Sequence, residues 1–299
     1  MALNLTGQPL VDRSDFAYLQ AQGVFGQWQE MAVQMNRDGY CLLHLHNQEH
    51  LQAVESVVSD MVSEFADPLK QWEAGAIGSP RLQDGWKDYQ SIRKLALSPV
   101  VLDLLESLYG RKPFAFQTLN FAVGSEQHYH SDAVHFSSYP MGFMCGVWFA
   151  LQTIELNSGP LHYFPGSHRL PYLSARDLDL SPEQVKAEQH PQVLFEPHWE
   201  EAVVTHGLRR ETFLAQAGDV FVWHANLLHG GDVVNDRTLR RWSQVVHYFF
   251  DDCLYTTPMQ NFRFDQGGAF VRNPLDIATG TERYGPAAWQ ELGLVGRQA

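Results

Sequence analysis

A series of short aromatic and β-branched runs in the second half of the chain constrains the fold most strongly. Glycine, proline, asparagine or aspartate bounds each run, and together the runs occupy residues 111–250. Short runs of this kind, separated by turn residues, are typical of antiparallel sandwiches and barrels. We therefore expect a β-rich core built from KPFAFQTLNFAVG, FMCGVWFALQTIEL, LHYFPGSH, ETFLAQAGDVFVWHANLLHGG and RRWSQVVHYFF.

The part of the chain before this core, residues 1–110, has a mainly helical pattern. Apolar residues recur there at helical spacing, and capping residues stand at the expected boundaries. Asn47 can cap one helix, and Ser98 and Gly110 can begin and end another. The expected helices are 15–37, 47–65 and 98–110, and the expected strand is 39–46.

The sequence contains no repeat and no long linker, so we expect a single domain over residues 1–299. Its core, 111–250, is interrupted by a polar and partly helical insertion at 172–208. The tail, 251–299, is rich in glycine, proline and aromatic residues, and such a segment can act as a lid.

Charge and cysteine content narrow the functional classes. The net charge of -13 argues against a nucleic-acid partner, which needs a basic surface. Three widely spaced cysteines favour neither a disulfide framework nor a thiolate zinc site. We see no secretion signal at the N-terminus and no apolar run near the ~20 residues of a membrane span. The expectation is a soluble cytoplasmic protein that acts on a small molecule, with its oligomeric state left open.

The segment SEQHYHSDAVHF, residues 125–136, concentrates histidines beside an acid. Its neighbours favour a strand that enters a loop, and residues two apart on a strand share a face. His130 and Asp132 can therefore converge on one metal ion, and the same parity leaves His128 open. A second His-x-acid triplet, His198 to Glu200, lies in a helical pattern, where residues two apart diverge.

A third ligand has to come from a distant segment, and GDVFVWHANLLHGGD offers His224 and His229. His229 precedes two glycines, which would allow a tight backbone turn. Two neutral imidazoles and one carboxylate form the facial arrangement of non-haem Fe(II) oxygenases, which leaves coordination positions open.

Two arginines at the start of the last apolar run, Arg240 and Arg241, are candidates for binding a carboxylate. A guanidinium can bind a carboxylate through two parallel hydrogen bonds. Strand alternation would place Arg241 and Ser243 on one face and Arg240 on the other. An arginine and a hydroxyl that face the barrel interior would suit the far carboxylate of a 2-oxo acid.

The order of these blocks resembles the phytanoyl-CoA dioxygenase family over roughly residues 35–250. The resemblance rests on the H-x-D triplet at 130–132, GVWFALQTIELNSGPLHYFPGSH at 146–168 and AGDVFVWHANLLHGG at 217–231, followed by Asn235 and Arg241. It implies a mainly β fold with flanking helices: a double-stranded β-helix, which is a jelly-roll and cupin-like barrel, with N-terminal helices packed on it. It also implies Fe(II), 2-oxoglutarate as cosubstrate, and O₂.

Carried over residue by residue, the resemblance implies specific roles in the site. The iron ligands are His130, Asp132 and His229, and no other histidine of these segments matches a ligand position. The 2-oxoglutarate arginine is Arg241, because it follows Asn235 by the family's interval of six residues. The resemblance further implies Trp148 and, as a looser match, Thr118 as cosubstrate contacts, and strand parity adds Ser243 beside Arg241. The acidic ligand position is intact, which disfavours the halogenating branch of the family.

The resemblance implies a dioxygenase that hydroxylates an unidentified small molecule while 2-oxoglutarate is decarboxylated to succinate and CO₂. The alternative is a cupin-like metal-dependent dioxygenase or isomerase that does not use 2-oxoglutarate and has no need of Arg241. Residues expected above the metal, and therefore candidates for substrate contact, are His135, Phe136, Tyr139, Trp86 and His224.

Overall fold

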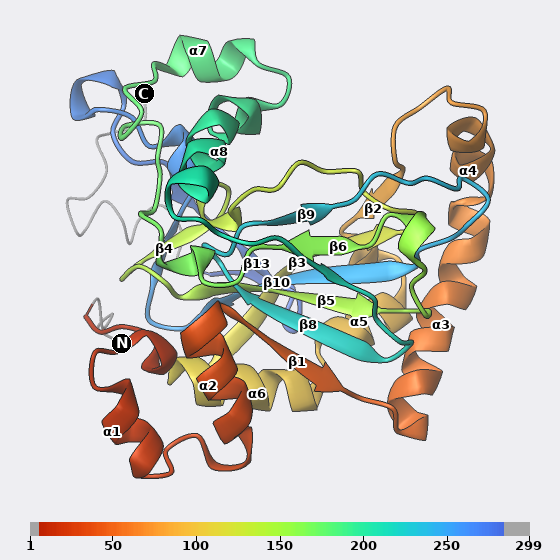
Figure 1. Ribbon diagram of the computed structural model, residues 1–299, viewed down its shortest axis with the longest axis horizontal. Coiled ribbons are helices and arrows are strands. Elements are labelled where there is room, and N and C mark those ends of the chain that lie inside the picture. The colour runs from red at the N-terminus through yellow and green to blue at the C-terminus, as the bar shows by residue number, and fades with distance from the viewer. Residues whose placement is uncertain (1–5, 284–299) are drawn as a thin grey trace.

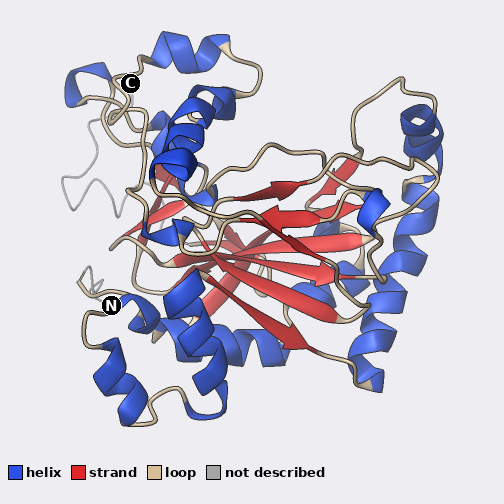
Figure 2. Ribbon diagram, in the orientation of Figure 1, coloured by secondary structure: helices blue, strands red, loops and turns tan. Residues whose placement is uncertain are grey.

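The structure is a computed structural model that describes residues 6–283. Helices lie at the periphery and strands in the centre of the molecule (Figures 1 and 2). The helices are α1 (Phe16–Ala21), α2 (Gln29–Asp38), α3 (Gln48–Glu64), α4 (Ala66–Glu73), α5 (Gln90–Ala96), α6 (Pro99–Tyr109), α7 (Pro182–Ala187) and α8 (Glu196–Thr205).

The strands form antiparallel sheets. They are β1 (Tyr40–His44), β2 (Arg81–Gln83), β3 (Pro113–Phe121), β4 (Ser137–Tyr139), β5 (Met144–Ala150), β6 (Leu161–Tyr163), β7 (Glu211–Phe213), β8 (Asp219–His224), β9 (His229–Gly231), β10 (Ser243–Phe250), β11 (Leu254–Thr256), β12 (Val271–Arg272), β13 (Leu275–Asp276) and β14 (Thr281–Glu282). The largest sheet has the order β1-β8-β5-β10-β3-β2. A smaller sheet, β7-β6-β9, packs on one of its faces through aromatic contacts such as Tyr163 with Phe221.

Side-chain alternation gives the two faces of the large sheet different roles. Val147, Val222 and Val246 belong to the core cluster that also contains residues of α3, α5 and α6. Trp148 and Phe221 alternate with these valines and pack with β6 and β7 instead. Because neighbours along a strand point to opposite faces, one face of the sheet is an apolar support and the other is available for a site.

The N-terminal expectations are confirmed in part. Strand 39–46 and helices 47–65 and 98–110 correspond to β1, α3 and α6. The single helix expected over 15–37 is wrong, because α1 ends at Ala21 and α2 begins only at Gln29. The interruption contains Gly23 and Gly26 at positive φ, a backbone conformation that does not continue a right-handed helix.

The insertion and the tail lie on different parts of the barrel. Residues 172–208 contain α7 and α8, as the polar pattern predicts, and these helices lie outside the central strands at the upper left of Figure 1. The described part of the tail adds β11 beside β4 and brings Ile277 into a backbone hydrogen bond with Ala115 on β3. The expected lid over 251–299 extends into residues 284–299, which lie outside the described residues.

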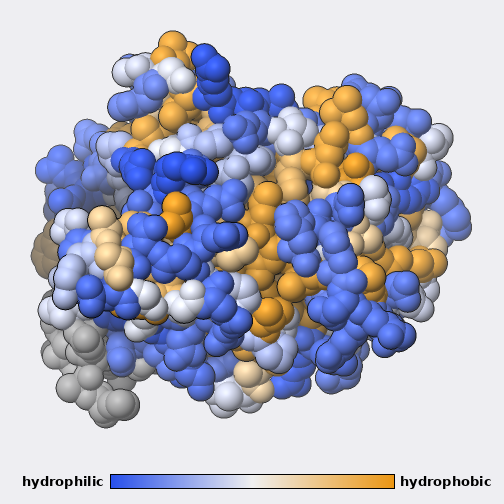
Figure 3. All heavy atoms as spheres, turned by 60° about the horizontal axis from the view of Figure 1, so that its bottom comes forward, coloured by the Kyte–Doolittle hydropathy of each residue, from blue (hydrophilic) through white to orange (hydrophobic). Residues whose placement is uncertain are grey.

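The surface is mainly hydrophilic on the face seen in Figure 3, with an apolar band across its middle. Within residues 6–283, no helix combines the length and apolar character needed to cross a membrane.

The two helix caps make a testable pair. The Asn47 side chain accepts a hydrogen bond from the backbone N–H of His50, whereas the Ser98 side chain makes no capping bond. We expect Asn47→Ala to lower the free energy of unfolding by about 1 kcal/mol. Ser98→Ala should change it by less than about 0.5 kcal/mol. Urea denaturation of both variants measures the difference, and equal effects would contradict the capping geometry.

Candidate metal centre

Two histidines from distant segments face each other across a short antiparallel bridge. The backbone N–H of His130 donates to the carbonyl of His229 at 2.9 Å, and the reverse bond is 3.1 Å. Their ring centroids are 4.7 Å apart. This pairing fixes both imidazoles relative to each other before any side-chain interaction is considered.

Asp132 joins the pair from a 3-10 turn, Asp132–Val134, which follows His130 directly. The strand expected to enter a loop here is limited to the bridge at His130, and Asp132 already belongs to the turn, but the two side chains converge as expected. One ligand atom from each of His130, Asp132 and His229 lies within 4.8 Å of the others, and all three residues are buried. His128 is outside this cluster, because its Nε2 lies 3.2 Å from Glu200 on α8.

Backbone carbonyls select the histidine tautomer. Nδ1–H of His130 donates to the carbonyl of His128, and Nδ1–H of His229 donates to that of Leu227, both at 3.0 Å. A carbonyl can only accept, so each ring presents an unprotonated Nε2 to the cluster when it is neutral. Burial lowers the pKa of His229 to about 4, which keeps this ring neutral at physiological pH.

The Asp132 carboxylate is held by two residues that the sequence analysis did not single out. Trp223 donates its indole N–H to Oδ2 at 2.8 Å, and Nε2 of His247 lies 3.3 Å from the same oxygen. Burial favours the neutral acid, but His229, His247 and the His130 contact outweigh it and hold the pKa of Asp132 well below its usual value. Asp132 is therefore an anion. Strand parity with Arg241 and Ser243 could have indicated His247.

The cluster lies in the wall of a cavity of about 970 Å³. Residues of the large sheet, including Gln117, Trp223, Val245 and His247, line it on the barrel side. The insertion contributes a further stretch, Gln189 to Val193, together with Glu196. No periodic or motif signal in the sequence identified these insertion residues. Met259 is the residue of the described tail that lines the cavity.

Arg241 brings a buried cation to the same cavity. Its residue exposure is 2%, and its guanidinium carbon lies 5.7 Å from the ring centroid of Trp148, which also lines the cavity. Among residues 6–283, Nε and Nη1 of Arg241 and the hydroxyl of Ser243 have no hydrogen-bond partner. Burial lowers the pKa of Arg241 to about 10, so it stays charged at neutral pH.

The two arginines separate as strand alternation expects. Arg240 points away from the cavity and pairs with Glu73 at the end of α4. Arg241 lies two residues before Ser243, the first residue of β10, and its backbone N–H donates to the carbonyl of Ala122. The geometry thus resolves which arginine is available inside the barrel.

The expectation that Thr118 contacts the cosubstrate is wrong. Thr118 pairs with Val246 across β3 and β10, and paired residues point to the same face. Val246 belongs to the helix-facing core, so Thr118 points away from the cavity. The residues of β3 that line the cavity are its alternation partners Gln117, Leu119 and Phe121.

Of the expected substrate contacts, His135 and Phe136 line the cavity. His135 also contacts Gln192 of the insertion at 3.1 Å. The other three are corrections, since none is among the described residues that line it. Trp86 packs in the helix-facing core, Tyr139 is exposed on β4, and His224 contacts Asp12 in a separate, smaller cavity.

The two glycines after His229 have a different role from the one expected. Neither adopts a positive φ, and both belong to β9. A Cβ on Gly230 would meet the carbonyl of Gln127 at 2.6 Å, and one on Gly231 would meet the Ser125 hydroxyl at 2.3 Å. They permit the 125–130 segment to approach β9 closely enough for His130 and His229 to pair.

Comparison with known proteins bears directly on this site. The family model described as phytanoyl-CoA dioxygenase (PhyH) matches residues 35–241, which is more than half of the chain. The chain belongs to the phytanoyl-CoA dioxygenase family. Membership places it in the superfamily of Fe(II)/2-oxoglutarate-dependent oxygenases. The mouse protein "Phytanoyl-CoA dioxygenase domain-containing protein 1" is 32% identical over 80 residues, which cover 25% of this chain and 28% of the mouse protein.

Solved structures of similar fold support the architecture of this phytanoyl-CoA dioxygenase family member. The non-heme alpha ketoglutarate dependent carbocyclase SnoK from nogalamycin biosynthesis has a TM-score of 0.60 at 15% identity, covering 88% of this chain and 95% of SnoK. EctD from S. alaskensis in its apoform has a TM-score of 0.55 at 19% identity, covering 90% and 83%. The expected double-stranded β-helix is confirmed.

Gly146 on β5 offers a test of how the site is supported. A Cβ at this position would lie 2.1 Å from the ring of Trp223, the residue that donates to Asp132. We expect Gly146→Ala to destabilise the fold by about 1–3 kcal/mol through overpacking. Gly78→Ala, whose Cβ meets open space, is the matched control and should be close to neutral. Urea unfolding and tryptophan fluorescence measure both effects. A neutral Gly146→Ala variant would contradict the packing.

Proposed function

We propose that this chain is an Fe(II)/2-oxoglutarate-dependent dioxygenase that hydroxylates a polar small molecule and releases succinate and CO₂. One combined observation carries the proposal. Three potential metal ligands converge at a cavity wall, and the same cavity contains a buried guanidinium with unpartnered N–H groups. A metal centre and a carboxylate-binding cation in one cavity are the two requirements of this class.

The residues fit an iron ion of the facial-triad type. His130 and His229 each direct Nε2 to the cluster while Nδ1–H is bound to a backbone carbonyl, and Asp132 offers an anionic oxygen for a dication. Two histidines and one carboxylate leave coordination positions for other ligands. When bound, iron would supply the oxygen-activating chemistry, and the protein would orient the reactants and exclude water from the site.

The residues also fit 2-oxoglutarate. Leaving a buried guanidinium without acceptors costs free energy, and the loss is largest for charged groups. A carboxylate bound between Arg241 and Ser243 would give the guanidinium an anionic acceptor and would also accept from the Ser243 hydroxyl. Trp148 would form an apolar wall beside it, and its own indole N–H also lacks a partner among residues 6–283. We therefore propose Arg241, Ser243 and Trp148 as the 2-oxoglutarate contacts and omit Thr118, which points away from the cavity.

The alternative of a cupin-like enzyme without 2-oxoglutarate gains no support from the site. Such an enzyme would have no use for a buried arginine without acceptors. Hydroxylation is the specific reaction that we propose, although the structurally similar SnoK is named as a carbocyclase.

The substrate that we propose carries polar groups, because amide, imidazole and carboxylate groups line the cavity beside apolar side chains such as Phe136 and Met259. His135 and Gln192 contact each other across it, one from the barrel and one from the insertion. Substrate binding between these elements would exclude water from the metal centre, a general requirement for controlled oxidation. With a turned-over substrate in hand, a product heavier by one oxygen atom taken from O₂ would support hydroxylation. Isomerisation or ring closure would contradict it.

The metal assignment predicts a difference between two neighbouring histidines. After anaerobic reconstitution with Fe(II), we expect His130→Ala to bind iron more than about 100-fold more weakly, because losing a group that only orients a ligand already costs roughly 10–100-fold. His128→Ala removes a ring that contacts Glu200 instead and should keep its iron. Iron content after desalting measures both, and equal retention would refute the assignment.

The cosubstrate assignment predicts a difference between two neighbouring arginines. Removing a buried partner of a carboxylate costs about 3 kcal/mol, or roughly 100-fold in affinity. We therefore expect Arg241→Ala to raise the KM for 2-oxoglutarate by that order in a succinate-release assay. Arg240→Ala, which only loses its contact with Glu73, should leave this KM unchanged. If the two variants have equal KM values for 2-oxoglutarate, Arg241 does not bind the cosubstrate. If the wild type does not turn over 2-oxoglutarate, the proposed enzyme class is wrong.

A further inference from the structure

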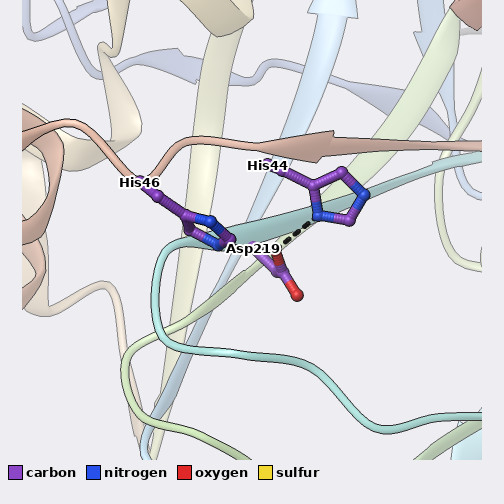
Figure 4. Close-up of side chains that lie close together, drawn as sticks. All are labelled: His44, His46 and Asp219. Atoms are coloured by element: carbon purple, nitrogen blue, oxygen red, sulfur yellow. Dashed lines mark hydrogen bonds and ion pairs between the residues drawn. The ribbon is translucent and has the colours of Figure 1, made fainter.

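A second cluster of potential metal ligands lies on the protein surface, outside the cavity. His44 ends strand β1, His46 follows two residues later, and Asp219 begins strand β8 (Figure 4). One ligand atom from each lies within 4.8 Å of the others. None of the three lines the large cavity. Asp219 and the cavity-lining Trp223 are four residues apart on the same strand, which corresponds to roughly 13 Å.

The two imidazoles converge on a single oxygen atom. Nδ1 of His44 lies 2.7 Å and Nε2 of His46 lies 3.0 Å from Oδ1 of Asp219. The side chains of His44 and His46 are 61% and 42% exposed, whereas that of Asp219 is 5% exposed. An exposed side chain that is free to sample many rotamers loses conformational entropy when it is ordered to bind a metal ion. Here both exposed rings are already oriented toward Asp219, so binding an ion would cost less conformational entropy.

The surrounding backbone fixes the carboxylate. Oδ2 of Asp219 accepts the backbone N–H of Gln216 at 2.8 Å, which leaves Oδ1 for the two rings. Asp219 is paired with His44 in the β1–β8 register, and Leu45 donates its N–H to the carbonyl of Gly218. Gly218 has a φ of +92°, and a Cβ there would meet the carbonyl of Leu45 at 2.8 Å. The turn is therefore tight, and the carboxylate is pre-positioned next to β1.

We propose that His44, His46 and Asp219 form a surface site for a divalent transition-metal ion of the Zn²⁺ type, separate from the iron centre. Imidazole nitrogen with carboxylate oxygen suits such ions, whereas Ca²⁺ and Mg²⁺ prefer sets made of oxygen alone. Ligand atoms around tetrahedral Zn²⁺ are about 3.3 Å apart when bonds are about 2.0–2.1 Å. The two ring nitrogens lie 2.7 Å and 3.0 Å from Oδ1 and within 4.8 Å of each other, and both rings are exposed and free to adjust to that spacing. Water would complete the coordination.

The bound ion would act as a cross-link at the edge of the large sheet. β1 is the edge strand and pairs only with β8 within the described sheet. An ion that binds the folded protein and not the unfolded chain stabilises the fold by mass action. The ion would therefore hold the end of β1, and the start of α3 that follows it, against β8.

Equilibrium dialysis against Zn²⁺ in excess Mg²⁺ tests the proposal on the full chain. The His44→Ala/His46→Ala variant should lose one equivalent of bound Zn²⁺ relative to the wild type. The matched control, His198→Ala/His206→Ala, removes two exposed histidines of the α8 region and should lose none. If His44→Ala/His46→Ala binds as much Zn²⁺ as the wild type, the surface site does not exist.

Two further variants separate this site from the iron centre and from the turn. His130→Ala/His229→Ala should retain the surface equivalent, and Zn²⁺ should still raise its Tm. Adding His44→Ala/His46→Ala to it should abolish both the binding and the Tm shift. Asp219→Asn can still accept the Gln216 N–H through its carbonyl, so it should keep the fold and lose the surface equivalent. Full Zn²⁺ binding by Asp219→Asn would overturn the ligand set, and binding without a Tm shift would overturn the cross-link.

Discussion

The hydrogen-bonded pair between the backbones of His130 and His229 is the contact on which the candidate metal centre depends. These residues are almost a hundred positions apart in the chain, and two backbone bonds bring their rings together. The pairing is possible because Gly230 and Gly231 carry no Cβ to keep the 125–130 segment away. Asp132 then reaches the rings from the turn that follows His130. The ligand geometry is thus set by main-chain contacts, which preorganise it independently of any bound ion.

The large sheet supports this arrangement by dividing its two faces. Valine and aromatic side chains on one face pack against the N-terminal helices and supply the apolar burial that stabilises the fold. Groups that are costly to bury lie over the opposite face: His247 on β10, Asp132 on the 3-10 turn after His130, and Arg241 just before β10. Trp223 takes part in both apolar packing and polar support. Its ring packs against Gly146, and its indole N–H donates a hydrogen bond to Asp132. The unpartnered N–H groups of Arg241 are a local cost that a bound carboxylate would offset.

Both ligand clusters combine two histidines with one aspartate, yet their environments differ. Burial and backbone hydrogen bonds fix the tautomers of His130 and His229 inside a cavity that could exclude water. His44 and His46 are exposed, and only Asp219 is held rigidly. If both proposals hold, similar donors serve different ends: chemistry at a buried cavity wall and cross-linking at an exposed sheet edge.

Local signals in the sequence were enough to determine the β-rich core, α3 with its Asn47 cap, and α6 with Gly110 as its C-cap. For the site they narrowed the candidates to a few histidines, Asp132 and two arginines, and the family resemblance selected His130, His229 and Arg241 among them. These features follow from turn residues, periodicity and short motifs, which act over a few positions. Tertiary structure alone decided the break between α1 and α2, the outward direction of Thr118, the approach of His247 and Trp223 to Asp132, and the insertion residues that line the cavity. Each of these depends on strand register or on packing between segments far apart in the chain. A one-residue difference in register exchanges the buried and cavity faces of a strand, and no local pattern in the sequence specifies which partner residue lies opposite.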